Sequence, residues 1–209
     1  MKQRYADTGL IGLILVYSWL SLNPGRLDMV VDDVKYLYVF SCFVYAFIFY
    51  RYDALLRAFF ILLLFCDYFL LFSQNMHKAI VVFAFAHAIN AYRIQPRWRI
   101  LLLYLFTLGL MSLLALKFHR LELFAGFYAF WLLADLFANI MAYRSFRSTP
   151  NRYGVIGLVL FVGCDLSVAW NYMHHTRLAY VGMWSFYGPA LFCILHSSHQ
   201  PGHTLDNSR

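Results

Sequence analysis

Long apolar runs alternate with short polar connections along the whole chain. Within each run the apolar residues are continuous rather than alternating, which favours membrane-spanning helices over the strands of a barrel. Several runs, the first and the fourth above all, are shorter than the roughly 20 residues that a straight span needs. The eight expected segments are Thr8–Leu22, Val34–Tyr50, Ala54–Phe72, Ala79–Tyr92, Ile100–Leu116, Leu121–Tyr143, Tyr153–Tyr172 and Leu178–Leu195.

This pattern predicts an all-α fold, a polytopic membrane bundle of about eight transmembrane helices. Short connections favour antiparallel neighbours in a single integral membrane domain over residues 1–209. The composition agrees, because 62% of the residues are hydrophobic and only 13% are charged. A soluble domain carries about 25% charged residues, so a separate soluble domain has no place in this chain.

The charge pattern indicates orientation rather than a nucleic-acid partner. The net charge is +7, but Lys and Arg stand singly between apolar runs and form no basic face or nucleic-acid motif. They are more frequent at the termini and in the even-numbered connections, such as those holding Arg51, Arg97 and Arg147. The positive-inside rule then places both termini in the cytoplasm, in a bacterial inner membrane or a eukaryotic endomembrane.

Two aspartates interrupt the apolar runs, and each follows a cysteine directly. Asp67 lies in LLLFCDYFLLF and Asp165 in LFVGCDLSVAW. An ionisable group at bilayer depth is costly unless it faces a cavity or a partner, so both are functional candidates. With the predicted topology, both lie roughly 18–20 Å from the cytoplasmic edge at 1.5 Å per residue. We therefore expect them to share one site.

The two aspartates also suggest an internal repeat. They are 98 positions apart in a chain of 209 residues, close to half its length. This spacing fits two four-helix units in parallel orientation, a 4+4 arrangement found in some membrane transporters. The two surrounding sequences share little beyond the Cys-Asp pair itself.

A close pair of carboxyls in a dry site suits acid–base chemistry. Two neighbouring carboxyls do not both ionise readily, so one holds a proton while the other is a carboxylate. The alternative is that Asp67 and Asp165 are structural, each hydrogen-bonded to a neighbouring helix.

Other polar residues accompany the aspartates at helical spacing. His87 and Asn90 share one helix face and would orient water or a substrate oxygen, or else form an interhelical hydrogen-bond pair. A polar stripe on the sixth segment would line the same cavity or form a packing network. Its members are Tyr128, Trp131, Asp135 and Asn139.

A metal centre is the weaker reading of these residues. Carboxylate and imidazole are ordinary ligands, so Asp67, His87 and Asp165 could in principle hold a metal ion. No pair of ligands with local spacing supports such a site, and the cysteines lack the spacing of a zinc site or a disulfide framework.

The order of these features resembles the YhhN-like family, the lysoplasmalogenases, which are eight-span hydrolases with both termini in the cytoplasm. Cys66-Asp67 stands where the family has a Gly-Asp pair, and His87 in FAFAHAINAY stands at the histidine of its fourth span. The segment GLVLFVGCDLSVAW is similar to the family's seventh span, with Asp165 as its acid, and Lys35 is similar to the lysine that opens its second span.

The chain also departs from the family pattern. Cys66 replaces a glycine, and Tyr36 stands where the family often has a proline. Pro189 stands near the position of a glutamine, and Asp135 is an acid that the family does not generally have.

The resemblance implies hydrolysis of the vinyl-ether bond of a lysoplasmalogen, giving a fatty aldehyde and a glycerophospho-alcohol, with no cofactor. Asp67 and Asp165 would be catalytic. One would protonate the vinyl-ether carbon, and the other would stabilise the resulting cation and activate water, as in glycoside cleavage. The residues expected to contact the lysophospholipid substrate are Lys35, His87, Asn90, Tyr128, Asp135 and Tyr187.

Two other classes of function stay open at this point. A transporter or channel for a small polar or lipid solute would also use parallel repeats and a midplane acid pair. A non-catalytic protein that binds membrane lipids is the third class, favoured by the departures from the family motifs.

Overall fold

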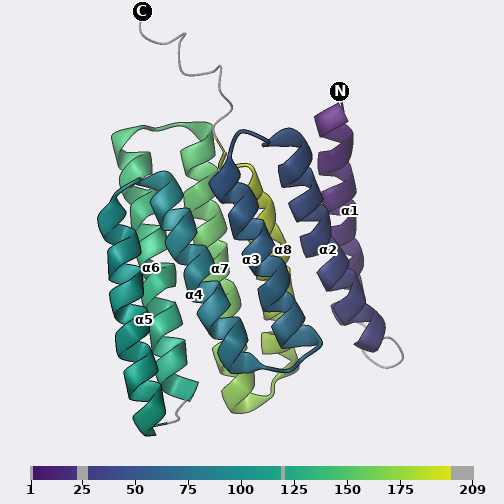
Figure 1. The fold of residues 1–209 in the computed structure, drawn as a ribbon. Helices are drawn as coiled ribbons and strands as arrows, with labels where there is room; N and C mark the ends of the chain where they lie inside the picture. Colours follow the sequence, from purple (N-terminus) through teal and green to yellow (C-terminus); the bar gives the residue numbers. More distant parts are fainter. Residues whose placement is uncertain (1, 23–27, 119–120, 199–209) are drawn as a thin grey trace, which may run out of the picture.

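A computed structural model describes residues 2–22, 28–118 and 121–198, and in these ranges every regular element is an α-helix. The helices form one bundle of roughly antiparallel neighbours (Figure 1). They are α1 (Lys2–Leu22), α2 (Asp28–Phe49), α3 (Ala54–Leu71), α4 (Met76–Ile94), α5 (Trp98–Phe118), α6 (Leu121–Ser145), α7 (Thr149–His174) and α8 (Arg177–Leu195). The all-α prediction is confirmed.

Each expected apolar run coincides with one helix, and the largest differences are at the starts of the first two. There α1 begins at Lys2 rather than Thr8 and α2 at Asp28 rather than Val34, because polar residues extend each helix beyond its apolar part. Four helices are long and apolar enough to cross a membrane, namely α3, α6, α7 and α8, and α5 has a shorter apolar stretch. The length and composition of these helices are those of a membrane protein.

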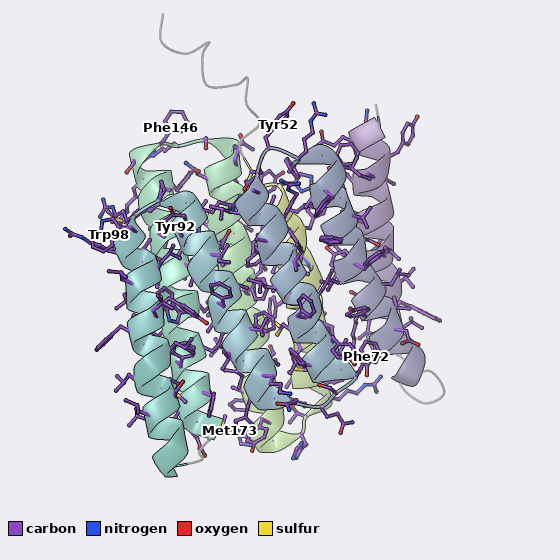
Figure 2. The ribbon with its side chains drawn as sticks, viewed as in Figure 1. Tyr52, Phe72, Tyr92, Trp98, Phe146 and Met173 are labelled. Atoms are coloured by element: carbon purple, nitrogen blue, oxygen red, sulfur yellow. The ribbon has the colours of Figure 1, made fainter. Side chains whose placement is uncertain are left out.

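The outer surface of the bundle is apolar, as expected for contact with lipid. On α5, Leu105, Phe106 and Leu113 are each more than 60% exposed, and Leu166 on α7 is 66% exposed. A soluble monomer rarely exposes large apolar side chains in such numbers. Exposed aromatic residues mark both ends of the bundle, with Trp98 at one end and Phe72 at the other (Figure 2).

The starts of several helices are fixed by local sequence. Asp53, Asn75, Ser148 and Thr176 each precede a helix, and each side chain accepts a hydrogen bond from a backbone N–H three residues later. These residue types are the preferred N-caps because they satisfy donors that the first turn leaves unpaired. The short connections therefore have a defined geometry, which places consecutive helices side by side.

The pairing of the helices has a regular pattern. α3 packs on α4 and α7 on α8; α2 packs on α3 and α6 on α7; α1 packs on α2 and α5 on α6. The remaining main pairings are α1 with α8, α5 with α4, α2 with α8, and α6 with α4. If each helix is replaced by the one four places later, counting from α8 back to α1, every pairing becomes another observed pairing. For example, α1 with α8 becomes α5 with α4.

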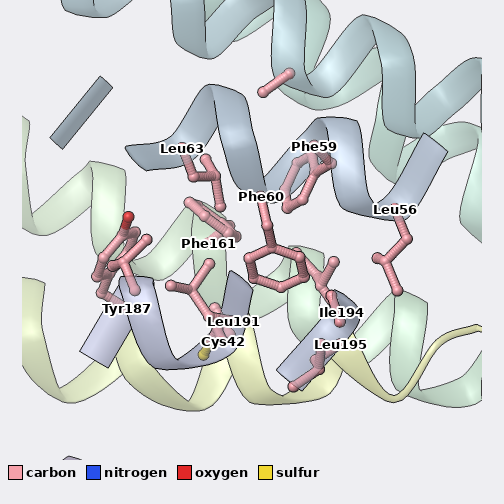
Figure 3. Packing of buried hydrophobic residues seen from close by; sticks show 14 of the residues in the cluster. Cys42, Leu56, Phe59, Phe60, Leu63, Phe161, Tyr187, Leu191, Ile194 and Leu195 are labelled. Atoms are coloured by element: carbon pink, nitrogen blue, oxygen red, sulfur yellow. The ribbon is translucent and has the colours of Figure 1, made fainter. Parts of the chain in front are cut away.

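The largest apolar core lies where α3 meets α2, α7 and α8. Phe59, Phe60 and Leu63 of α3 are fully buried, and the Phe60 ring projects toward α8 (Figure 3). Leu191 and Ile194 of α8 lie against them. A second core joins α4, α5 and α6 around Ala84, Tyr104 and Trp131.

The helices α7 and α8 approach each other closely at Gly157. A Cβ atom on this residue would lie 2.8 Å from Ile194 Cγ1 and 3.0 Å from the Ala190 carbonyl oxygen. Glycine is therefore required for the close approach of the two helices rather than for its backbone freedom.

Replacement of Gly157 by alanine should destabilise the bundle. The added methyl group overpacks the α7–α8 contact, and we expect the thermal midpoint in detergent to fall by about 2–6 °C. Gly126→Ala on α6 is the matched control, because a Cβ there meets nothing within 4 Å. It should leave the midpoint unchanged or raise it, since alanine has the higher helix propensity. Equal midpoints for the two variants would contradict the packing argument.

Candidate functional site

Both aspartates that interrupt the apolar runs accept a hydrogen bond from a tyrosine hydroxyl of another helix. Tyr187 of α8 donates to Asp67 Oδ2 at 2.7 Å, and Tyr128 of α6 donates to Asp165 Oδ2 at 2.6 Å. These distances are typical of a hydroxyl on a carboxylate. Asp67 is buried and Asp165 is partly buried. Each bond holds one carboxyl oxygen and fixes the direction of the other.

A run of aromatic rings joins the two carboxyl–tyrosine pairs. The Phe161 ring centroid lies 5.6 Å from that of Tyr187 and 5.3 Å from that of His87. The His87 ring in turn lies 5.7 Å from the Tyr128 ring. The two carboxyl–tyrosine pairs therefore flank one aromatic cluster, which we define as Phe83, His87, Tyr128, Phe161 and Tyr187.

The cysteines before the two aspartates support this proximity. The thiols of Cys66 and Cys164 each interact electrostatically with both carboxyls, Asp67 and Asp165. Cys66 also donates a hydrogen bond to the Ala79 carbonyl oxygen at 3.3 Å, which ties α3 to α4 beside the site. Residues from both halves of the chain thus surround the two acids.

Lys35 of α2 lies on the Asp67 side of the site. Its Nζ donates to Asp32 Oδ1 at 3.1 Å and to the Tyr180 hydroxyl at 3.3 Å. The ammonium also lies 3.4 Å from the centroid of the Trp184 ring, a favourable contact between a cation and an aromatic face. The Lys35 charge interacts electrostatically with Asp67. Asp67 therefore has a cation in its surroundings.

Asp135 of α6 is fully buried at the centre of a hydrogen-bond network. His87 Nδ1 lies 2.9 Å from Asp135 Oδ2, and Asn90 Nδ2 lies 2.9 Å from both carboxyl oxygens. Asn139 Nδ2 donates to Asp135 Oδ1 at 3.0 Å. Three side chains thus direct nitrogen atoms at this carboxyl. An ionised carboxyl has only acceptors, so this arrangement of donors fits a carboxylate.

The other nitrogen of the same imidazole has no partner. His87 is completely buried, and its Nε2 makes no hydrogen bond to any described residue. A buried polar atom without a partner costs roughly 1–3 kcal/mol. His87 is therefore satisfied on the Asp135 side only.

The network continues from Asn90 to the end of the bundle where α3 begins. Arg93 Nε donates to Asn90 Oδ1 at 3.0 Å, and Arg93 Nη1 donates to Asp53 Oδ2 at 3.0 Å. Asp53 Oδ2 also accepts from the Ser198 hydroxyl at 2.8 Å. Polar groups thus connect His87 with residues at the end of the bundle.

Burial alone would raise the pKa of Asp53, but its partners outweigh this effect. The Arg93 guanidinium, the Leu56 N–H and the Ser198 hydroxyl all favour the carboxylate, and together they hold the pKa below its usual range. This ion pair lies outside the apolar stretches and joins the start of α3 to the end of α4.

The structure assigns the expected site residues to three places. Tyr128 and Tyr187 hold the two aspartates, and His87 lies between them in the aromatic cluster. Asn90 and Asp135 lie in the adjoining network, and Lys35 lies against Trp184 and interacts electrostatically with Asp67. One member of the polar stripe points elsewhere, because Trp131 Nε1 donates to Thr107 on α5 at 3.2 Å.

Sequence reasoning missed two features of the site. Phe161, which contacts both His87 and Tyr187, carried no signal because it is one of many phenylalanines in apolar runs. The Arg93–Asp53 pair was also missed, because its two residues lie 40 positions apart in the sequence. Asp53 directly before an apolar run was the one available sign, because it marks a helix N-cap.

The described residues hold no group of three or more His, Cys, Asp or Glu side chains arranged to bind a metal ion. Asp67, His87 and Asp165 are therefore neighbours without being gathered as one ligand set.

Comparison of the chain with models of protein families, with curated proteins and with solved structures finds no match. The resemblance to the YhhN-like family thus stays a prediction from the motifs, and the functional argument depends on the site itself.

Asp53→Asn should remove an acid-sensitive part of the stability. The asparagine keeps the cap on Leu56 but loses the charge that pairs with Arg93. Because the folded pKa of Asp53 is below its unfolded value of about 3.9, this contribution is complete above that value. It is lost as the pH falls through the folded pKa.

Thermal unfolding in detergent between pH 3 and pH 7 measures this effect. We expect the midpoint of the variant to lie below that of the wild type at pH 7, and the gap to close toward pH 3. A gap of constant size over this range would contradict the assignment of the charge effect to Asp53.

Proposed function

We propose that the protein is an intramembrane hydrolase that cleaves the vinyl-ether bond of a lysoplasmalogen to a fatty aldehyde and a glycerophospho-alcohol. One observation carries the proposal. Asp67 and Asp165 come from different helices, and each accepts a hydrogen bond from one tyrosine. The two carboxyl–tyrosine pairs flank one aromatic cluster inside an apolar bundle. The rings offer an apolar wall for an alkenyl chain, and the carboxyls offer acid–base chemistry.

The chemistry needs little more than these groups. A carboxylic acid gives its proton to the vinyl-ether carbon, which leaves an oxocarbenium-like cation. A carboxylate stabilises the positive charge, as in glycoside cleavage. Water adds to the cation and loses one proton, giving a hemiacetal. The hemiacetal collapses to the aldehyde and the alcohol when one proton moves from its hydroxyl to the leaving oxygen. One water molecule is consumed.

Tyr128 and Tyr187 would position the acids rather than react. Each hydroxyl engages one oxygen of its aspartate, so the second oxygen has a defined direction. Lys35 would favour a substrate phosphate on the Asp67 side, since an ammonium is a common phosphate partner. His87 would contribute from within the aromatic cluster, and Asn90 and Asp135 from the network behind it.

We further propose that all eight helices cross the membrane, with both termini in the cytoplasm. The start of α1 and the end of α8 lie at the same end of the bundle (Figure 1). Arg51, Arg97 and Arg147 lie in the connections at that end. A surplus of such residues on one side is the signature of the cytoplasmic face.

The proposed architecture is two four-helix units in parallel orientation, with the site between them. The regular pairing of the helices supports it, because α1–α4 pair as α5–α8 do. The surroundings of the acids agree with this correspondence. Asp67 interacts with α2 through Lys35 and with α8 through Tyr187. Asp165 interacts with the corresponding helices, α6 through Tyr128 and α4 through His87.

A transporter is the second candidate, and one observation favours it. Polar side chains follow one another from Lys35 near one end, through the acids and Asp135, to Arg93 near the other. Transporters use such groups to line a pathway at the repeat interface. Solute flux into vesicles without a lipid product would favour this candidate, whereas lipid binding with neither flux nor product would indicate a lipid-binding protein.

Replacement of either aspartate should abolish most of the activity. Asp67→Asn and Asp165→Asn keep the side-chain size but remove the titrating group, and we expect losses of at least about 100-fold each. The double variant should be little worse than either single one, because the two groups act as a unit. The assay measures aldehyde release by purified protein, with lysoplasmalogen and an ordinary lysophospholipid compared side by side.

Glu122→Gln is the matched control for this experiment, since Glu122 is an exposed acid in the first turn of α6. It should retain activity within about twofold, as expected for a surface change. Turnover like that of the wild type in Asp67→Asn or Asp165→Asn would remove that residue from the mechanism.

Activity should survive exhaustive chelation, because proton transfer between carboxyls and a vinyl ether requires no Lewis acid. The pH profile should be bell-shaped, as expected for an acid and a carboxylate that act together. Loss of turnover on chelation, followed by its return with added zinc or manganese, would contradict this mechanism.

A further inference from the structure

His87 occupies a distinctive place between the aromatic cluster and the buried Asp135. Its Nδ1 lies 2.9 Å from Asp135 Oδ2, while its Nε2 is buried without a hydrogen-bond partner. The Asp135–Asn90–Asn139 network accounts for the first nitrogen and leaves the second unexplained. An unsatisfied buried nitrogen in the aromatic cluster that joins the two carboxyl–tyrosine pairs indicates that a further molecule binds there.

The chemistry of Asp135 determines the tautomer of His87. A carboxylate only accepts hydrogen bonds, so a carboxylate at Asp135 places a hydrogen on His87 Nδ1 and, when the ring is neutral, the lone pair on Nε2. Asn90 and Asn139 also donate to this carboxyl, which holds its plane. The same arrangement of carboxylate and imidazole prepares the histidine as a base in hydrolases with a catalytic triad.

The rings around His87 hold the imidazole in one orientation. Phe83 lies nearly parallel to it, with an interplanar angle of 16°, and Phe161 meets it edge-on at 89°. On the third side the Tyr128 ring lies 5.7 Å away, and its hydroxyl is bonded to Asp165. His87 also interacts electrostatically with Asp165. The imidazole is therefore a neighbour of one of the two catalytic candidates in particular.

The two acids accordingly have different surroundings. Asp67 has the Lys35 ammonium among its charged neighbours. Asp165 has His87, a group able to exchange protons with it. The two acids thus differ in their neighbours, which are a lysine for Asp67 and an imidazole for Asp165.

We propose that His87, oriented by Asp135, is the base that takes a proton from the attacking water and passes it to Asp165. Asp165 is then the acid that protonates the vinyl-ether carbon, and Asp67 is the standing carboxylate. This inference rests on the proposed hydrolase function and assigns a role to each group. Asp135 is a positioning residue, since it acts only through His87.

The protons balance over one turnover. Asp165 gives its proton to carbon and becomes a carboxylate, and the cation forms opposite Asp67. Water forms the new C–O bond as His87 Nε2 takes one of its protons. The imidazolium then returns a proton to Asp165, which restores both groups. The hemiacetal collapses with no net change in protons.

The test measures steady-state aldehyde release from lysoplasmalogen by the full-length protein in detergent micelles. His87→Ala should lower kcat by at least about 100-fold with little change in KM, as for a lost base. Added imidazole should restore at least about tenfold, because it replaces the missing base. His77→Ala, an exposed histidine on the same helix, is the control and should keep full activity with no response to imidazole.

A second measurement covers the case in which His87→Ala does not fold. Nitrogen NMR of labelled histidines in the wild type should show His87 protonated on Nδ1, and Asp135→Asn should lose this preference and at least about 100-fold in kcat. Protonation on Nε2 would overturn the inference. So would a His87→Ala variant with activity within threefold of the wild type.

The failure of the two proposals can be told apart. If the wild type releases aldehyde and His87→Ala does so equally well, the hydrolase stands and the base is misassigned. If the wild type releases no aldehyde from lysoplasmalogen, the proposed function fails and the role of His87 fails with it.

Discussion

The buried carboxyl group of Asp135, with the side chains that hydrogen-bond to it, is the constraint on which the interior of the bundle depends. A charge away from water is destabilising by several kcal/mol unless hydrogen bonds and opposite charges compensate it. Here His87 and Asn90 of α4 and Asn139 of α6 direct nitrogen atoms at it, so the compensation comes from the α4–α6 contact. Any shift of α4 against α6 would break several hydrogen bonds together. The position of His87 in the aromatic cluster therefore follows from the burial of Asp135.

The same network connects the interior to the end of the bundle. Asn90 uses its amide hydrogens on Asp135 and its oxygen on Arg93, and Arg93 continues to Asp53 at the start of α3. Asn90 donates to Asp135 and accepts from Arg93, and the positive charge of Arg93 faces the negative charge of Asp53. An apolar surface around such a network prevents water from substituting for a missing partner. The orientation of the polar side chains is consequently set by the protein alone.

Sequence reasoning reached the helices and the two acids but not their partners. Continuous apolar runs predict helices because few other structures satisfy the backbone in an apolar environment. Asp67 and Asp165 were identifiable because a carboxyl in such a run is rare. The tyrosine that holds Asp67 lies 120 residues away, and the aspartate that holds His87 lies 48 residues away. Such pairs depend on which helix faces pack together, and faces rich in Leu and Phe carry little information on that choice.

The polar stripe of α6 also shows that the sequence does not predict which helices pack together. Helical spacing placed Tyr128, Trp131, Asp135 and Asn139 on one face, but a face of this width meets more than one neighbour. Trp131 turns to Thr107 of α5, whereas Asp135 turns to α4. Periodicity therefore predicts which residues share a face and leaves open which helix each one meets.

The unpaired Nε2 of His87 is stronger evidence for a bound molecule in this bundle than it would be in a soluble protein. Water reaches most unsatisfied groups at an aqueous surface, so a missing partner there has little meaning. In this bundle the neighbouring polar groups are satisfied by one another, and the rings of Phe83 and Phe161 cover the imidazole. An unpaired buried nitrogen costs roughly 1–3 kcal/mol. Phenylalanine in place of His87 fills a similar volume and avoids this cost. Phenylalanine would, however, leave Asp135 without its histidine donor, so the two residues are tolerable only together. A buried pair that leaves one nitrogen unsatisfied is best explained by chemistry performed at that nitrogen, in the aromatic cluster that contains the Asp165 partner Tyr128.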